Sequence, residues 1–365
     1  MARLTRTRRL WFSLLLTLVL VAVGPSPAPA VTLHVANNGE DSDGCGAEGS
    51  PCRSISRAIA NADRGDTIIV GPGRYGDLDG DGAFDGAGEE TAPAECGCMI
   101  EVNKRLTLQS RDGAGVTVLD AGGAGVNVVR IFAGFVIFGG DGKGFTLTRG
   151  NGGLEVPLGA LGLRAEGNLA VRNARDGFAG QFGRLKNNLA VANGHNGFFV
   201  LTSFGELTGN LAVANGIDGF ALTLNAARVS LSGNRAVANR GHGFFIAGRK
   251  NTLERNAVLG NRRFGIALLT DDVTITENNI YGNNSEEFNG LTNCGLHMAV
   301  DGSLDVTNNF WGSADGPGPD PADAICNPGG AGIDSEPFAT REFRIDVRLP
   351  RPRPPLPPVD VLPHD

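Results

Sequence analysis

A repeat of 20 to 24 residues fills the middle of the chain and limits its fold more than any other feature. Each copy has two Asn residues five positions apart that flank an apolar segment, and a polar residue, Gly and Phe follow. One copy is Asn188–Asn193 with Asn196-Gly197-Phe198. Full copies begin at Asn168, Asn188, Asn210 and Asn234, a looser copy begins at Asn256, and partial copies begin at Asn278 and Asn308. Three short apolar segments and their turns within such a period make one coil of a β-solenoid, and successive coils lie about 4.8 Å apart.

Residues at the same offset in each copy should form columns along the solenoid. The Phe column predicts an interior stack of aromatic rings, made by Phe178, Phe198, Phe220 and Phe244, with Ile266 next. The two Asn columns place side-chain amides at turns, where each amide can bond the coils above and below. Ala and Val columns are adjacent in every copy, so only one of them can face inward. The sequence leaves open which one does.

Less regular coils are expected before the repeats. The segments Leu106–Gln109, Val116–Leu119 and Gly144–Thr148 alternate apolar and polar residues as strands do. Ser54–Ala62 has the apolar spacing of a short amphipathic helix, which would cover the open edge of the first coil. We therefore expect a β-solenoid over residues 31–348, with its regular repeats in residues 162–312.

Both termini differ from this body. Arg3, Arg6, Arg8 and Arg9 precede the apolar run Leu10–Val23, and small residues end the segment at Ala30. This pattern predicts a signal peptide over residues 1–30, because the run is too short to span a membrane. The mature chain should therefore be secreted, extracellular or at the cell surface, with the periplasm as an alternative, and without a membrane span. Residues 349–365 are Pro-rich and predict an extended tail.

The net charge limits the possible partners, and the cysteines suggest disulfides. The chain has a net charge of −7, and removal of the four arginines in residues 1–30 makes it −7 − 4 = −11. Nucleic acid is therefore not expected as a partner. The six cysteines of an exported protein suggest disulfides, and we pair Cys45 with Cys52 and Cys294 with Cys326. Cys96 and Cys98 either close a small ring or pair elsewhere.

Two segments resemble a known family. They are CGAEGSPCRSISRAIANADRGDTIIVGPGRY, from Cys45 to Tyr75, and NNFWGSADGPGPDPADAIC, from Asn308 to Cys326. With the repeats, they make residues 32–345 similar to the bacterial right-handed parallel β-helix repeat proteins of the pectate-lyase-like superfamily. The resemblance implies an all-β, right-handed, single-stranded parallel β-helix with a short N-terminal capping helix. It implies a polysaccharide partner but no particular reaction, because members include lyases, glycosidases, epimerases and proteins without known catalysis.

An acidic loop over residues 77–90 is a candidate calcium site. Asp77, Asp79, Asp81 and Asp85 occupy positions 1, 3, 5 and 9 of a calcium-loop pattern that has Gly at position 6. Position 12 is Gly88, and Glu89 or Glu90 could supply the missing carboxylate. The sequence predicts one bound calcium ion, and the alternative is a solvated acidic loop.

The polar residue before each repeat Gly gives weak catalytic candidates, namely Asp176, Asp218 and His242. Stacked coils would separate the two Asp residues by about 9–10 Å, near the carboxylate spacing of inverting glycosidases. We favour a structural interpretation, because Asp, Asn and His before Gly commonly stabilise turns through backbone hydrogen bonds.

A basic cluster nearby is a candidate glycan site. Arg240 and Arg262 follow the second Asn of successive copies, and Arg263 is adjacent. Together with Asp218 and His242 they would form a stripe able to bind an anionic polysaccharide. Three functions remain open: an exported polysaccharide-binding protein, a lyase, hydrolase or epimerase acting on an acidic glycan, and a non-catalytic surface or matrix protein.

Overall fold

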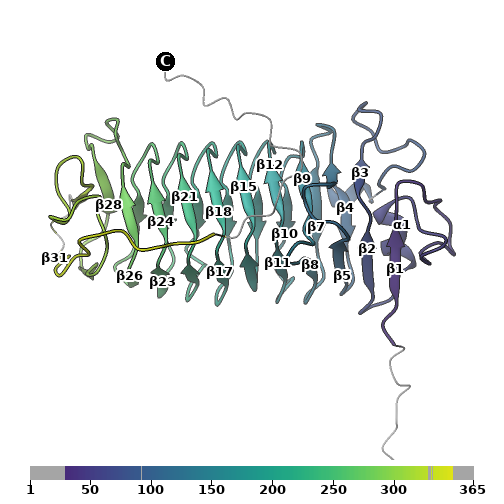
Figure 1. Cartoon of the computed structure of the whole chain (residues 1–365), viewed down its shortest axis with the longest axis horizontal. Coiled ribbons are helices and arrows are strands. Elements are labelled where there is room, and N and C mark those ends of the chain that lie inside the picture. Colours follow the sequence, from purple (N-terminus) through teal and green to yellow (C-terminus); the bar gives the residue numbers. More distant parts are fainter. Residues whose placement is uncertain (1–28, 92, 328–329, 331, 348–365) are drawn as a thin grey trace, which may run out of the picture.

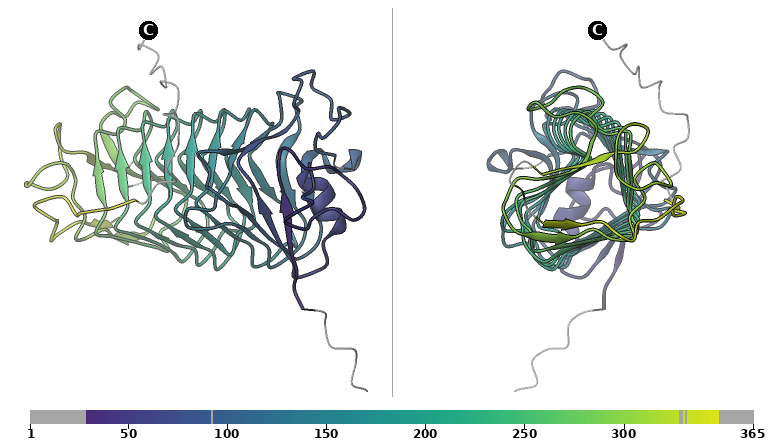
Figure 2. Two further views of the ribbon diagram at one scale, coloured as in Figure 1. Left: turned by 45° about the vertical axis from the view of Figure 1, so that its right-hand side comes forward. Right: turned by 90° about the vertical axis from the view of Figure 1, so that its left-hand side faces the viewer.

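The computed structural model describes residues 29–91, 93–327, 330 and 332–347, which form an elongated stack of coils (Figures 1 and 2). The Pro-rich tail and all but the last two residues of the predicted signal peptide lie outside the described residues. Each regular coil contributes one strand to each of three parallel sheets. Parallel strands joined by crossovers wind with a right-handed sense, so the body is the right-handed single-stranded parallel β-helix expected from the sequence.

We name the sheets I, II and III in the order in which a coil visits them. Sheet I contains β1 (Thr32–Val35), β2 (Thr67–Val70), β5 (Thr107–Ser110), β8 (Ile137–Gly139), β11 (Arg164–Glu166), β14 (Arg184–Lys186), β17 (Glu206–Thr208), β20 (Ser230–Ser232), β23 (Asn251–Glu254) and β26 (Val273–Thr276). Sheet II contains β3 (Gly73–Gly76), β6 (Thr117–Asp120), β9 (Thr146–Thr148), β12 (Leu169–Val171), β15 (Leu189–Val191), β18 (Leu211–Val213), β21 (Arg235–Val237), β24 (Ala257–Leu259) and β27 (Asn279–Tyr281). Sheet III contains β4 (Cys98–Val102), β7 (Asn127–Ile131), β10 (Leu154–Val156), β13 (Phe178–Gly180), β16 (Phe198–Val200), β19 (Phe220–Leu222), β22 (Phe244–Ile246), β25 (Ile266–Leu268), β28 (Cys294–Met298) and β30 (Ala324–Cys326).

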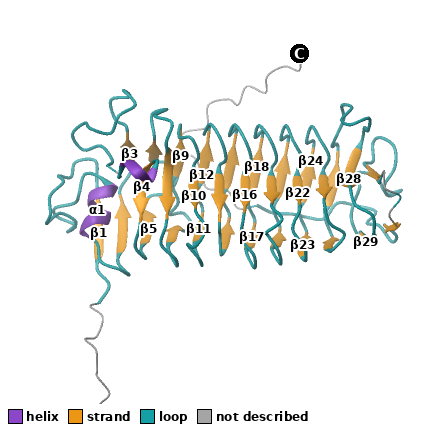
Figure 3. Ribbon diagram, turned by 180° about the vertical axis from the view of Figure 1, so that it is seen from behind, coloured by secondary structure: helices purple, strands orange, loops and turns teal. Residues whose placement is uncertain are grey.

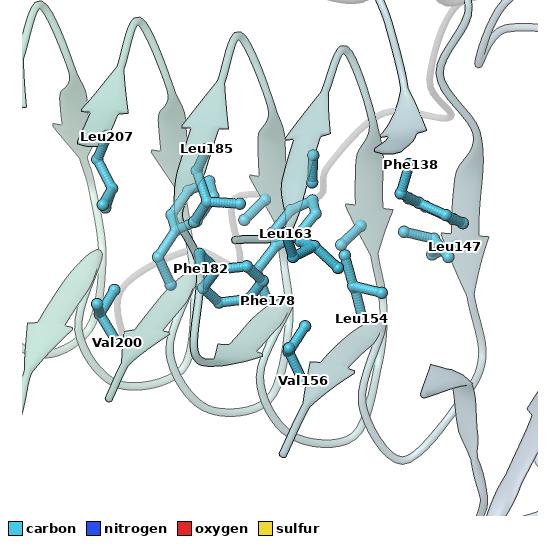
Figure 4. Packing of buried hydrophobic residues seen from close by; sticks show 14 of the residues in the cluster. Phe138, Leu147, Leu154, Val156, Leu163, Phe178, Phe182, Leu185, Val200 and Leu207 are labelled. Carbon is cyan, nitrogen blue, oxygen red and sulfur yellow. The ribbon is translucent and has the colours of Figure 1, made fainter. Parts of the chain in front are cut away.

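The interior is filled by apolar columns from all three sheets. The predicted Phe stack is confirmed: the rings of Phe178, Phe198, Phe220 and Phe244 are fully buried, with neighbouring centroids 4.7–5.0 Å apart. Sheet I contributes Leu columns, and Figure 4 shows Leu185 pointing into the same space as Phe178. In sheet II the Ala column faces inward, and the Leu and Val columns face outward. The small Ala side chain leaves room for the ring from sheet III.

Two ladders of buried Asn side chains follow the corners on either side of sheet II. Each side-chain amide donates to the Asn oxygen of the next coil, as Asn193 does to Asn215 at 3.0 Å. The second ladder ends on Asp323, whose carboxylate accepts from Asn283. In the first ladder Asn278 bonds Asn309, so the predicted column position of Asn308 is wrong by one residue. Asn308 instead has the positive φ, 59°, of the residue that precedes each ladder Asn at a corner of the coil.

The two ends of the stack are covered differently. Helix α1 (Ile55–Asn61) lies at the N-terminal end, with Ser54 as its N-cap, close to the predicted helix (Figure 3). The buried Glu90 carboxylate accepts the backbone N–H groups of Ile55 and Ser56. A 3-10 turn, η1 (Ala94–Cys96), precedes β4, and β29 (Ser303–Asp305) pairs with β31 (Gly332–Asp334) at the other end.

Residues 337–347 form a strap that runs back over the coils on the outside (Figure 1). The Asn279 side chain of β27 holds it by two hydrogen bonds of 2.9 Å to the Phe343 backbone. The predicted disulfides Cys45–Cys52 and Cys294–Cys326 are confirmed, and Cys96 pairs with Cys98 to close the small ring.

Candidate functional site

The outer face of sheet III carries an alternating column of aromatic and small side chains. The strands β16, β19, β22, β25 and β28 place Phe199, Ala221, Phe245, Ala267 and His297 in register. The three rings are half-buried, and each lies two coils from the next. Their strands β16, β22 and β28 are labelled in Figure 3. Two coil steps are about 9.6 Å, since neighbouring strands are about 4.8 Å apart. The rings are therefore evenly spaced along the face, whereas the Ala side chains between them are buried. Phe264 belongs to the same buried cluster as Ala267 and stacks on His297 with ring centroids 4.2 Å apart.

The turn before sheet III carries the predicted polar column, and its side chains are bonded to one another or to the turn backbone. The Asn196 amide and backbone N–H both donate to Asp176, at 2.9 and 3.0 Å. The backbone N–H of Asp218 donates to the Asn196 oxygen, and that of His242 donates to Asp218 at 2.7 Å. Asn196 thus lies between the two Asp residues whose spacing suggested a glycosidase pair. These contacts are those of a turn-stabilising ladder.

His242 and Asp218 lie in an apolar setting that changes their ionisation. Burial, with Arg263 next, lowers the pKa of His242 to about 4, so the imidazole is neutral at physiological pH. Burial raises the pKa of Asp218 to about 6, against the opposing effects of the His242 N–H and of Arg263. His242 packs on Phe264 with ring centroids 5.2 Å apart, and its Nδ1 atom is buried without a hydrogen-bond partner among the described residues. A neutral imidazole can accept a proton, but here it is enclosed.

The predicted basic residues lie beside this turn, and the insertion that contains Glu286 and Phe288 contacts two of them. Arg240 and Arg262 hold equivalent backbone positions, because their N–H groups bond the carbonyls of successive ladder residues, Asn215 and Asn239. Arg262 forms an ion pair of 2.9 Å with Glu286. Arg263 lies over the Phe288 ring, 4.4 Å from its centroid. Arg240 is exposed and makes no ion pair within 4.0 Å among the described residues.

The acidic loop brings together three of the five predicted calcium ligands. Carboxylate oxygens of Asp77, Asp79 and Glu89 lie within 4.8 Å of one another, with Asp77 and Glu89 buried. Asp77 accepts the N–H groups of Gly80 and Gly82. Asp81 and Asp85 are exposed and outside this group. Glu90 instead caps helix α1.

The aromatic column is the part of this site that sequence reasoning missed. Phe199 and Phe245 each follow a core Phe directly, so strand alternation alone would have predicted that they face outward. His297 follows the non-periodic insertion, and its register could not be read from the repeat.

Comparisons with known proteins agree with this architecture. Residues 155–314 match the family model described as periplasmic copper-binding protein (NosD). No curated protein sequence matches the chain. The chain is similar in structure to a rhamnogalacturonan lyase, with 12% identity, a TM-score of 0.50, and 86% of this chain and 90% of that chain covered. It also resembles pectate lyase Pel9A, with 16% identity and a TM-score of 0.48, over 85% of this chain and 78% of that chain.

A third similar structure is the A-module of the Azotobacter vinelandii mannuronan C-5 epimerase AlgE4. It has 16% identity and a TM-score of 0.44, over 80% of this chain and 92% of that chain. At these identities the likeness concerns the fold and not the reaction. No helix within the described parts of the chain is both long enough and apolar enough to cross a bilayer. The repeats and the three parallel sheets identify the chain as a right-handed parallel β-helix repeat protein, a fold that it shares with the rhamnogalacturonan lyase.

Proposed function

We propose that the protein is exported and binds an acidic polysaccharide along the outer face of sheet III. The carrying observation is the column of Phe199, Phe245 and His297 beside exposed arginines. An aromatic ring offers a flat apolar surface on which the C–H face of a sugar ring packs. Arg240 and Arg263 lie at the edge of this face, where a guanidinium can pair with a sugar carboxylate.

Binding is proposed without turnover. A lyase or epimerase needs a base that reaches the substrate and a cation that holds the neighbouring carboxylate. Asp176, Asp218 and His242 remain the candidate catalytic residues, but their polar atoms face the turn or a closed apolar setting. Arg262 is paired with Glu286, whereas Arg240 and Arg263 make no ion pair within 4.0 Å among the described residues.

The test replaces the two Phe residues of the column by Ala, the residue that alternates with them. Phe199→Ala with Phe245→Ala puts Ala at positions where Ala221 and Ala267 already occur, so the coil should tolerate the change. Affinity for polygalacturonate or alginate, measured by calorimetry, should fall about 5- to 150-fold, because each of the two rings contributes a contact of about 0.5–1.5 kcal/mol. Arg240→Ala with Arg263→Ala should weaken the same interaction, and Leu224→Ala, at an exposed position away from the column, is the control.

Unchanged affinity in the Phe variant would move the site elsewhere, and failure of the parent protein to bind any acidic glycan would remove the proposal. Appearance of new reducing or unsaturated ends during incubation would favour the enzyme alternative. A protein that neither binds nor cleaves a glycan would favour the structural surface role.

We also propose that the acidic loop binds one calcium ion through Asp77, Asp79 and Glu89. Three oxygen ligands that converge in one loop suit a hard cation such as calcium. Heat of binding at millimolar calcium should disappear in Asp79→Asn and persist in Asp85→Asn, which alters an exposed Asp outside the group. Equal binding by both variants, or no heat in the parent, would contradict the assignment.

Copper, named in the description of the matching family, is not part of the proposal. Copper sites favour imidazole, thiolate and thioether ligands. All six cysteines are in disulfides, and Met99 and Met298 are buried in the interior. The groups of potential metal ligands within the described residues contain only Asp, Glu and disulfide-bonded Cys.

A further inference from the structure

A second candidate binding surface lies on the outer face of sheet I, away from the aromatic column. Two hollows of about 390 and 430 Å³ open side by side there. They share Ile137, Arg164 and Arg184, from strands β8, β11 and β14. Together they form a groove across successive coils, which we call the sheet I groove.

The groove contains a pair of like charges, of which only one has an acidic partner. Arg164 and Arg184 are directly paired in the parallel register of β11 and β14. Like charges opposite one another destabilise a sheet unless water or an anion screens them. Arg184 lies 3.5 Å from Glu206, whereas Arg164 is exposed and is in no ion pair within 4.0 Å among the described residues. An anion bound between the two guanidinium groups would relieve this repulsion.

The side chains that line the two hollows carry a net positive charge. Arg105, Lys143, Arg164, Arg184 and Lys186 line the two hollows, against Asp141, Glu166 and Glu206. Glu166 is engaged by Lys186 at 2.9 Å. The groove is therefore locally positive on a chain whose net charge is −7. A locally positive groove on an acidic protein attracts an anionic ligand.

An exposed aromatic ring forms one wall. Phe135 is 63% exposed and has a positive φ of 58°, a conformation that is uncommon for a bulky residue. Its ring lies over Gly162, where a Cβ would come within 2.7 Å of the ring carbons. Gly162 and Gly183 line the floor without side chains. An apolar wall, an open floor and cationic edges suit a flat ring that carries carboxylates.

We infer that the sheet I groove binds a short segment of a linear polysaccharide that carries carboxylates. Its carboxylates pair with Arg164 and Arg184, and one sugar ring packs on Phe135. For the class of ligand this inference rests on the proposed function, but the site is separate, on a different sheet. A chain with one glycan site on sheet III and another on sheet I joins two polysaccharide strands.

The experiment compares variants of the described chain. Arg164→Ser with Arg184→Ser should be tolerated, because Ser230 and Thr252 hold the same column in later coils. Phe135→Ala removes the aromatic wall without a change of charge. Arg255→Ser with Arg344→Ser is the charge-matched control, since both arginines are surface residues in ion pairs outside the groove. Isothermal titration with a galacturonate tetramer, its methyl ester and inorganic phosphate gives stoichiometry and affinity, and light scattering with long polygalacturonate reports cross-linking.

The parent and the control should bind two tetramers per chain and cross-link the polymer. The double Arg variant should bind one tetramer per chain, with affinity at the groove reduced about 100-fold, and should not cross-link. Phe135→Ala should reduce affinity at the groove about tenfold.

One tetramer per parent chain, unaffected by the Arg and Phe135 changes, would overturn the inference and leave the sheet III proposal standing. Binding that is lost in the Arg variant but kept in Phe199→Ala with Phe245→Ala would support the groove and overturn the sheet III proposal. Equal affinity for phosphate and tetramer would overturn the glycan assignment. Absence of binding by the parent would overturn both proposals.

Discussion

Replacement of Asn215 tests how much the Asn ladders stabilise the coil stack. The side chain is fully buried and makes four hydrogen bonds: it accepts from the Asn193 backbone and amide and donates to Ala190 and Asn239, at 2.9–3.1 Å. Asn215→Ala removes all four. At a net value of about 0.5–1.5 kcal/mol each, the loss in unfolding free energy is about 2–6 kcal/mol.

Asn215→Asp tests the hydrogen bonds that Asn215 donates separately from those that it accepts. An ionised carboxylate can still accept from Asn193, but it cannot donate to Ala190 or Asn239. Because the site is buried, the folded-state pKa of the new Asp should be raised, as that of Asp323 at the end of the same ladder is raised to about 6. The variant should therefore be most stable at acidic pH, where the carboxyl is protonated, and should lose stability as pH rises through the folded-state pKa.

Guanidinium unfolding of the parent and both variants between pH 4 and 8 gives the comparison. Asn225→Ala, at an exposed loop position, is the control and should change stability by less than about 0.5 kcal/mol. Hydrogen exchange should locate the loss in the neighbouring coils, since each coil contacts only its neighbours. A loss below about 1 kcal/mol for Asn215→Ala, or an Asp variant without pH dependence, would refute the reasoning.

Three further changes probe the interior. Phe220→Ala removes a ring stacked at 4.7 Å on both neighbours and should cost about 3–5 kcal/mol in thermal or chemical unfolding, whereas an unchanged melting temperature would contradict the stack. Asp323→Asn should stabilise the protein at pH 7 by up to about 3 kcal/mol and have little effect near pH 4, because burial raises the pKa of Asp323 from 3.8 to about 6. Gly219→Ala would place a Cβ 2.7 Å from the Gly243 carbonyl oxygen and should cost about 1–3 kcal/mol in the same assay, whereas equal stability would mean that the coils can move apart there.

Periodicity explains which parts of the fold were predictable. A shared offset places residues in one column whatever the details of the coil, so the Phe stack and both Asn ladders followed from spacing alone. The choice between Ala and Val in sheet II did not follow, because it depends on how much interior volume the rings from sheet III occupy. Asn308 and Asn309 could not be separated either, since both residues suit a turn and only the backbone φ distinguishes them.

The candidate sites were less predictable, because their contacts come from outside the repeat. The arginine stripe was placed correctly in register, but Glu286 and Phe288 belong to a single insertion whose path no periodic pattern encodes. Arg164 and Arg184 share an offset four residues before their ladder Asn, so their column was readable. The hollows beside them were not, since these depend on the positions of Gly162 and Gly183.

The alternation on the outer face of sheet III has a consequence for how this molecule can change in length. Both ends of the stack are finished by elements outside the regular coils, so a duplicated coil could enter the middle and leave both ends as they are. One extra coil, however, would put two rings or two Ala residues in succession and shift every later ring by half a period. An insertion of two coils would preserve the phase. Lengthening in pairs would therefore extend the aromatic column with its spacing intact, whereas a single added coil would divide it into two columns offset by one coil.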